Sequence, residues 1–251
     1  MQLTLLGTGN VGHVPVYGCP CSACLRAQQH PQYRRGKTSA VIEHKGKILL
    51  LDANHSELMT RFPSGTIDTI LLTHFHMDHV QALFDLRWGV GAPIPVLTPP
   101  DLVGCDDLYK HPGILQFDAL TEFKPFYWQD IKITPVPMQH SKLCFGYLLE
   151  YNHKRLAYFT DTVGFPALSK PFIQETDIDI MLLDCNHPPM HDSASCNHND
   201  VSLAQQIKQQ YKIKKMGLIH VSHQLDEWAI NHPDCFSEHF FLTTDGQAFN
   251  L

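Results

Sequence analysis

Short apolar runs that alternate with polar residues dominate this chain, and that pattern is typical of β-strands. Residues 40–44 and 47–52 alternate in this way around Lys45-Gly46, which predicts a β-hairpin. A second hairpin is predicted around residues 152–154. Its strands, and the other apolar runs that predict strands, cover residues 144–150, 155–160, 2–6, 69–73, 93–98, 131–137, 178–184 and 216–220.

Two other segments predict helices. Residues 78–88 follow the strand at 69–73 directly and place their apolar side chains on one helical face. Residues 200–211 predict a second helix, with Asn199 or Asp200 near its N-cap. Strands with helices between them predict an α/β fold.

We expect a single domain over residues 1–251, because no linker, low-complexity tract or internal repeat interrupts the chain. The first strand leads into a glycine-rich turn at residues 7–12. No Gly-Lys-Ser/Thr follows, so the turn is not a Walker loop, and Pro15 blocks the helix that a dinucleotide site needs. We therefore interpret these glycines as permitting a tight backbone path beneath an active site.

The net charge is −6, which disfavours general binding of nucleic acid. Arg34, Arg35 and Lys37 form a basic cluster, which is either a solvated loop or a phosphate contact. No apolar run reaches the roughly 20 residues of a membrane-spanning helix. The first ten residues lack the pattern of a signal peptide, so we expect a cytoplasmic protein without membrane contact.

Histidine is unusually abundant, with 17 residues, and residues 74–79 (HFHMDH) concentrate three of them. His74 and His76 lie two apart in extended chain and point the same way, whereas Asp78 and His79 begin the next helix. One loop thus offers two ligands to each of two adjacent metal positions. The alternative, a polar loop of ordinary surface histidines, does not explain four potential ligands in six positions.

Two metal ions need further ligands, and His140, Asp161 and His220 each follow an apolar strand run. Taken singly, each is more often a surface residue or a hydrogen-bonded core residue. Taken together, they complete a site at one edge of stacked sheets. Asp161 is suited to bridging, because its two oxygens can serve two metals.

Cys19, Cys21 and Cys24 place three thiols within six residues. Because we see no export signal in the sequence, metal binding is favoured over disulfides. A structural zinc needs a fourth ligand, for which His223 is the candidate. Such an ion would join the N-terminal loop to the edge of the active site. The alternatives are free thiols or a redox pair, which lacks its expected context.

Residues 74–79 match the H-x-H-x-D-H motif, so the chain resembles the metallo-β-lactamase superfamily. The resemblance implies an αββα sandwich with a dinuclear metal site at one edge. It assigns His74, His76 and His140 to the first ion, with Asp161 bridging. It assigns the other three side chains, Asp78, His79 and His220, to the second ion.

Longer segments are similar to the PhnP family, phosphodiesterases of the bacterial carbon–phosphorus lyase pathway, from residue 3 to about 245. The similarity implies hydrolysis of 5-phosphoribosyl 1,2-cyclic phosphate to ribose 1,5-bisphosphate. It also implies manganese or zinc in the active site, with a metal-bound hydroxide as nucleophile, a structural zinc and a homodimer. The segments are GTG, VPVYGCPCSAC, PQYRR, LLTHFHMDHVQALF, LRWGVGAPIPV, QHSKLCFGYLLE, DCNHPP and HVSHQ.

His198 matches the family position of the general acid, and we predict Asp78 and His198 as catalytic residues. The alternative for His198 is a solvated histidine at a helix start. Arg34, Arg35 and Lys142 are unranked candidates for the substrate's second phosphate.

Three other functions compete with the cyclic phosphodiesterase. A transfer-RNA 3′-processing nuclease is disfavoured by the acidic charge and by the lack of an inserted basic arm. A protein of pyrroloquinoline quinone biosynthesis shares an N-terminal cysteine cluster. The third alternative is a zinc-bound scaffold that has lost catalysis. The complete set of seven active-site ligand candidates argues against it.

Overall fold

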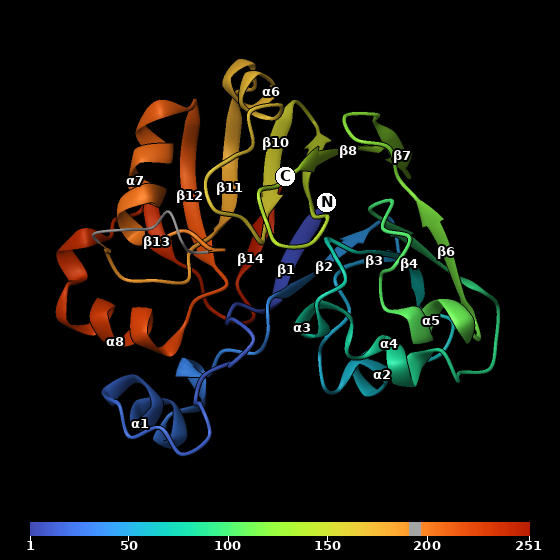
Figure 1. The fold of residues 1–251 in the computed structure, drawn as a ribbon, viewed down its shortest axis with the longest axis horizontal. Helices are drawn as coiled ribbons and strands as arrows, with labels where there is room; N and C mark the ends of the chain where they lie inside the picture. Colours follow the sequence, from blue (N-terminus) through green and yellow to red (C-terminus); the bar gives the residue numbers. More distant parts are fainter. Residues whose placement is uncertain (191–196) are drawn as a thin grey trace.

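Two seven-stranded β-sheets lie face to face in the computed structural model, which describes residues 1–190 and 197–251 (Figure 1). The first sheet has the strand order β14-β1-β2-β3-β4-β5-β6. Its strands are Gln2–Gly7 (β1), Ser39–His44 (β2), Lys47–Leu51 (β3), Ile67–Leu71 (β4), Ile94–Thr98 (β5), Leu115–Ala119 (β6) and Ala248–Asn250 (β14).

The second sheet has the strand order β13-β12-β11-β10-β9-β8-β7. Strands β10 to β13 are parallel, whereas β7, β8 and β9 form an antiparallel meander that leads into β10. The strands are Phe126–Trp128 (β7), Ile131–Pro137 (β8), Phe145–Tyr151 (β9), Lys154–Phe159 (β10), Ile178–Asp184 (β11), Ile213–Ile219 (β12) and Phe240–Leu242 (β13).

Helices cover the outer face of each sheet (Figure 1). None of those in the described ranges is long and apolar enough to cross a membrane. The α-helices are Ser22–Gln29 (α1), Leu58–Arg61 (α2), Met77–Val80 (α3), Leu83–Leu86 (α4), Asp106–Lys110 (α5), Lys170–Glu175 (α6), Val201–Gln210 (α7) and His223–Asn231 (α8), and the 3₁₀ helices are Pro31–Tyr33 and Pro233–Cys235.

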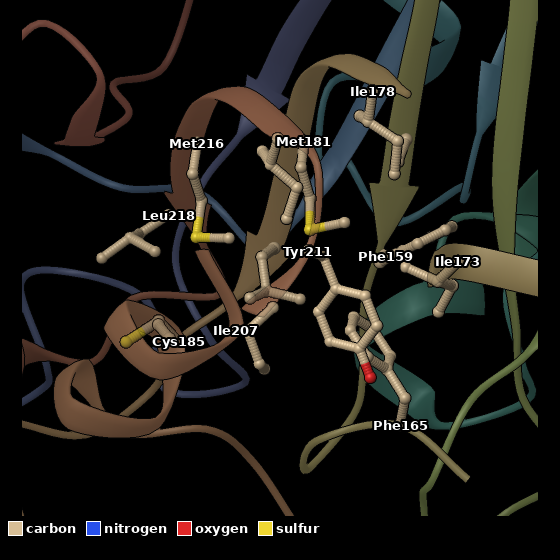
Figure 2. Close-up of a cluster of buried hydrophobic side chains, with 14 of the residues drawn as sticks. Phe159, Phe165, Ile173, Ile178, Met181, Cys185, Ile207, Tyr211, Met216 and Leu218 are labelled. Carbon is tan, nitrogen blue, oxygen red and sulfur yellow. The ribbon is translucent and has the colours of Figure 1, made fainter. Parts of the chain in front are cut away.

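Apolar side chains fill the three interfaces between these layers. Leu5, Leu49, Tyr147 and Tyr158 belong to a cluster drawn from the facing sides of both sheets. A second cluster packs the outer face of the second sheet against α6 and α7. Figure 2 shows Ile207 of this cluster beside the methionines of β11 and β12. A third cluster packs the first sheet against α2, α4 and α5. This layering confirms the predicted αββα sandwich.

All of the predicted strands and both predicted hairpins are confirmed, with shifts of up to three residues at their ends. The predicted helix 200–211 is also confirmed as α7. Asp200 is its N-cap, because its side chain accepts a hydrogen bond from the backbone N–H of Leu203.

The prediction of one helix over residues 78–88 is wrong, because the structure has two short helices, α3 and α4. The loop after β3 takes up the backbone groups that would continue the first helix. Ala82 donates its N–H to the carbonyl oxygen of Ala53, and the carbonyl oxygen of Asp78 accepts from Asn54 Nδ2. The helix therefore ends within one turn.

The glycine-rich turn, residues 7–12, lies at the edge of the sandwich where strand β12 ends. A Cβ atom on Gly7 would lie 2.1 Å from the carbonyl oxygen of Lys37, so only glycine fits there. Asn10 donates its N–H to the carbonyl oxygen of Val221, the residue after His220. The structure thus places the turn beneath the predicted site.

Candidate metal centre

The predicted site residues meet because strands that run in the same direction end at the same edge of the sandwich. Strands β3 and β4 are parallel, and so are β10, β11 and β12. The residues that follow the carboxyl ends of such strands gather there. These include Asp52 after β3, His74 and His76 after β4, His140 after β8, Asp161 after β10 and His220 after β12.

One group consists of His74, His76, His140 and Asp161, whose ligand atoms lie within 4.8 Å of one another. His76 Nδ1 lies 2.9 Å from His74 Nε2 and 3.1 Å from His140 Nε2. Burial lowers the pKa of all three imidazoles. Neutral imidazole is the form that binds a metal.

A second group consists of Asp78, His79, Asp161 and His220, and its ligand atoms also lie within 4.8 Å of one another. Asp78 Oδ2 lies 3.6 Å from His79 Nε2 and 3.5 Å from His220 Nε2. His220 has φ +60° at the end of β12, a left-handed conformation that is uncommon for a histidine.

Asp161 belongs to both groups and is only 2% exposed. Its Oδ2 atom lies 3.3–3.8 Å from the Nε2 atoms of four histidines, two from each group. Burial alone would raise the pKa of this carboxyl, but the neighbouring imidazoles, His220 and His79 first, hold it well below its usual range. An ionised carboxylate therefore lies where two ligand sets meet.

The chemistry of the second group fits a metal ion. The Nε2 atoms of His79 and His220 are buried and have no hydrogen-bond partner among the described residues. Both atoms face carboxylate oxygens at distances too long for good hydrogen bonds. Buried polar atoms are rarely left without a partner, and a cation shared by these ligands would satisfy them.

Asp52, which the sequence analysis missed, positions one of the imidazoles. His79 Nδ1 donates to Asp52 Oδ2 at 2.7 Å, which directs His79 Nε2 toward the centre. Thr73 donates both its N–H and its hydroxyl to the same carboxylate. The only signal in the sequence is that Asp52 ends the predicted strand 47–52.

His198 lies at the margin of the centre and contacts a second carboxylate that the sequence analysis missed, Asp184. His198 Nδ1 donates to Asp184 Oδ2 at 2.7 Å. Its ring stacks on His220, with centroids 4.6 Å apart. Burial disfavours the charged ring, but the Asp184 carboxylate outweighs it and the pKa of His198 rises to about 9.

The cysteine cluster also meets its predicted partner, 204 residues away in the sequence. His223 Nδ1, at the start of α8, lies 3.4 Å from Cys19 Sγ and 3.5 Å from Cys21 Sγ. The ligand atoms of Cys19, Cys21, Cys24 and His223 all lie within 4.8 Å of one another. Three thiols and one imidazole at this spacing form a potential tetrahedral zinc site.

The three candidates for phosphate binding differ in their surroundings. Arg35 is buried and forms a bidentate pair with Asp226, at 2.7 and 2.9 Å, so its guanidinium is already occupied. Arg34 is exposed, and its Nε donates to the carbonyl oxygen of Ala27. Lys142 Nζ lies 3.4 Å from the carbonyl oxygen of Gly104.

The sequence of this chain is similar to those of known proteins with the metallo-β-lactamase fold. The model of the beta-lactamase superfamily domain matches residues 49–221, which is more than half of the chain. An octanoyltransferase from Porphyromonas gingivalis is 29% identical over 183 residues, covering 66% of this chain but 36% of that protein. A ribonuclease Z from Mycolicibacterium gilvum is 23% identical over 203 residues, covering 68% of this chain and 64% of that protein. The chain thus spans less than two thirds of either relative.

Solved structures match over nearly the whole chain. A diphosphatase from the PhnP family has a TM-score of 0.80 at 26% identity, covering 99% of this chain and 96% of that one. Zinc-bound PqqB from Methylobacterium extorquens has the same TM-score at 19% identity, covering all of both chains, which shows a shared fold. The chain therefore belongs to the beta-lactamase superfamily and has the metallo-β-lactamase fold.

Proposed function

We propose that this protein is a metal-dependent phosphodiesterase that hydrolyses 5-phosphoribosyl 1,2-cyclic phosphate to ribose 1,5-bisphosphate. The observation that carries the proposal is the pair of four-residue ligand groups that share the Asp161 carboxylate. Two adjacent cation positions suit the in-line displacement at phosphorus that hydrolysis of a phosphodiester requires.

In this proposal, the first group holds one divalent ion, manganese or zinc, and the second group holds another. Bound ions would activate water for attack on phosphorus and neutralise the charge of the phosphoryl group. The ligands of the first ion are His74, His76, His140 and Asp161, and those of the second are Asp78, His79, Asp161 and His220.

His198 serves as the general acid. When water adds to phosphorus and the bond from phosphorus to the ribose 2-oxygen breaks, that oxygen needs a proton. The hydrogen bond to Asp184 uses His198 Nδ1 and leaves Nε2 to donate to the leaving oxygen. Asp184 is itself fixed, because its Oδ2 atom also accepts the N–H of Thr162.

The cysteine cluster has a separate, structural role. We propose that a zinc ion bound by Cys19, Cys21, Cys24 and His223 fixes the loop before α1 to the start of α8. Because His223 lies three residues after His220, this ion would hold the N-terminal loop beside the catalytic centre.

Similarity to a diphosphatase of the PhnP family supports phosphate chemistry and favours a second candidate substrate, a phosphoric anhydride. The ribonuclease Z relatives make RNA a third substrate to assay.

One assay separates these activities. The manganese-loaded protein is given 5-phosphoribosyl 1,2-cyclic phosphate, a 2′,3′-cyclic nucleotide, a nucleoside diphosphate sugar and a transfer-RNA precursor. We expect kcat/KM for the ribosyl cyclic phosphate to exceed the others by at least about 100-fold. A higher kcat/KM for the anhydride or the RNA precursor would reject the proposed substrate.

A further inference from the structure

A cavity of about 700 Å³ lies beside the metal centre and contains none of the proposed metal ligands. This volume suits a small organic ligand. Five separate parts of the chain line the cavity: the loop after β1, the segment before β2, the loop after β3 with the start of α2, the segment from the end of α3 into α4, and Asp245 between β13 and β14. A ligand in it would therefore contact segments that the fold already holds together.

Residues of the cavity lining contact the backbone of the second ligand group. Asn54 lines the cavity, and its Nδ2 atom donates to the carbonyl oxygen of Asp78. Lys37 also lines the cavity and precedes Thr38, whose hydroxyl oxygen accepts the N–H of His220. A group bound there would lie next to the backbone that positions two of the proposed ligands.

Two cations of the cavity lining, Arg34 and Lys37, make only neutral contacts. Lys37 Nζ donates to the neutral amide of Gln81, and Arg34 Nε donates to a backbone carbonyl. Neither cation is paired with a carboxylate of residues 1–190 or 197–251. Arg35 also lines the cavity, but its pairing with Asp226 leaves no net charge there.

Two carboxyl groups lie among the lining residues and differ in their availability. Asp245 uses both oxygens, because Oδ1 accepts from the Thr8 hydroxyl and Oδ2 accepts from the N–H of Gly36. Burial also raises the pKa of Asp245. Asp245 has the charge of Arg35 as a neighbour, whereas Asp85 is exposed and is the carboxylate whose oxygens are free to compete with a bound phosphate for the two cations.

We propose that this cavity binds the phosphate group of a small phosphorylated sugar, held by Arg34 and Lys37. Guanidinium and ammonium groups are the side chains that bind phosphate most strongly. The inference rests on the proposed function for the identity of the sugar. The phosphate is either the distal phosphate of the substrate or that of a separate effector, and both present the same chemistry to the cavity.

The test is calorimetric titration of the metal-loaded protein with ribose 5-phosphate. We expect the double variant Arg34→Gln/Lys37→Gln to weaken binding at least about 10-fold. Asp85→Asn, which removes the opposing charge, is expected to strengthen binding about 3-fold. Lys124→Gln changes an exposed lysine outside the cavity and serves as the control, with unchanged affinity.

Equal affinity of the double variant and the wild type would mean that the metal centre alone holds the phosphate, and would overturn the proposal. A circular dichroism spectrum of each variant checks folding. The single variant Lys37→Arg keeps Arg34 and a cation at position 37, so it should retain part of the affinity that the double variant loses.

The mode of inhibition of bis(p-nitrophenyl) phosphate hydrolysis then distinguishes the two sources of the phosphate. Competitive inhibition by ribose 5-phosphate assigns the cavity to the substrate, and a changed turnover at saturating diester assigns it to an effector. Neither result depends on which natural substrate the protein hydrolyses, so the two proposals fail separately.

Discussion

At the scale of single residues, each of two carboxylates behind the centre determines which nitrogen of a histidine faces inward. Asp52 accepts from His79 Nδ1, and Asp184 accepts from His198 Nδ1. Such partners fix the tautomer and the orientation of an imidazole, and metal affinity depends on both. The hydrogen bond to a carboxylate therefore orients a proposed metal ligand, His79, in one case and the proposed general acid, His198, in the other.

Asp52→Asn tests the first of these interactions. The amide keeps the volume of the side chain but removes the charge that holds His79, so we expect the affinity for one of two ions to fall about 10- to 100-fold. Titration of the metal-free protein with Mn²⁺ measures this. Asp118→Asn, at an exposed position of β6, is the matched control. Two undisturbed binding steps in Asp52→Asn would contradict the role of Asp52.

His198→Ala tests the role of the second histidine, which we propose as the general acid. Removal of a general acid should lower kcat about 10²- to 10⁴-fold while the metal content stays at the wild-type value. Steady-state kinetics and metal analysis of the same preparation measure both quantities. Metal lost together with activity would identify His198 as a ligand, which the grouping of its ring with Asp161, Asp184 and His220 allows.

At the scale of elements, the cysteine loop joins the first helix to the last. Cys21 is the N-cap of α1, where its Sγ accepts the N–H of Cys24, and His223 begins α8. One bound ion would therefore connect two helices that are distant in the sequence.

Cys21→Ser separates metal binding from capping, because a serine oxygen also caps a helix. We expect the variant to lose one zinc per chain and to unfold about 5–10 °C lower, since a ligand that binds only the folded state stabilises it. Cys235→Ser, at a free cysteine outside the cluster, is the control. Unchanged zinc content in Cys21→Ser would exclude the structural zinc.

The strands could be predicted because their apolar residues recur with a regular period or form continuous buried runs. The helices α1 and α8 escaped prediction, because each buries only two or three residues and lacks a clear apolar stripe. The strands β6, β7, β13 and β14 also escaped prediction; all four lie at sheet edges, and all except β6 have only three residues. The break between α3 and α4 depends on hydrogen bonds to the loop after β3, which no local pattern encodes.

At the scale of the whole molecule, the site exists because strands of two sheets end at one edge. The seven predicted active-site ligands meet there, although they span residues 74 to 220. Their residue types and their positions after apolar runs made them predictable. Asp52 and Asp184 have the same position, but they contact other side chains of the centre, and only tertiary structure shows those contacts.

The most direct test of the central claim, a catalytic centre with two metal ions, is the activity of the protein after its metals are removed. The protein is treated with EDTA, dialysed and assayed on bis(p-nitrophenyl) phosphate, with circular dichroism to check that it stays folded. We predict that cleavage is abolished and that about two equivalents of Mn²⁺ per active site restore it. Full activity in the folded, metal-free protein would contradict the account.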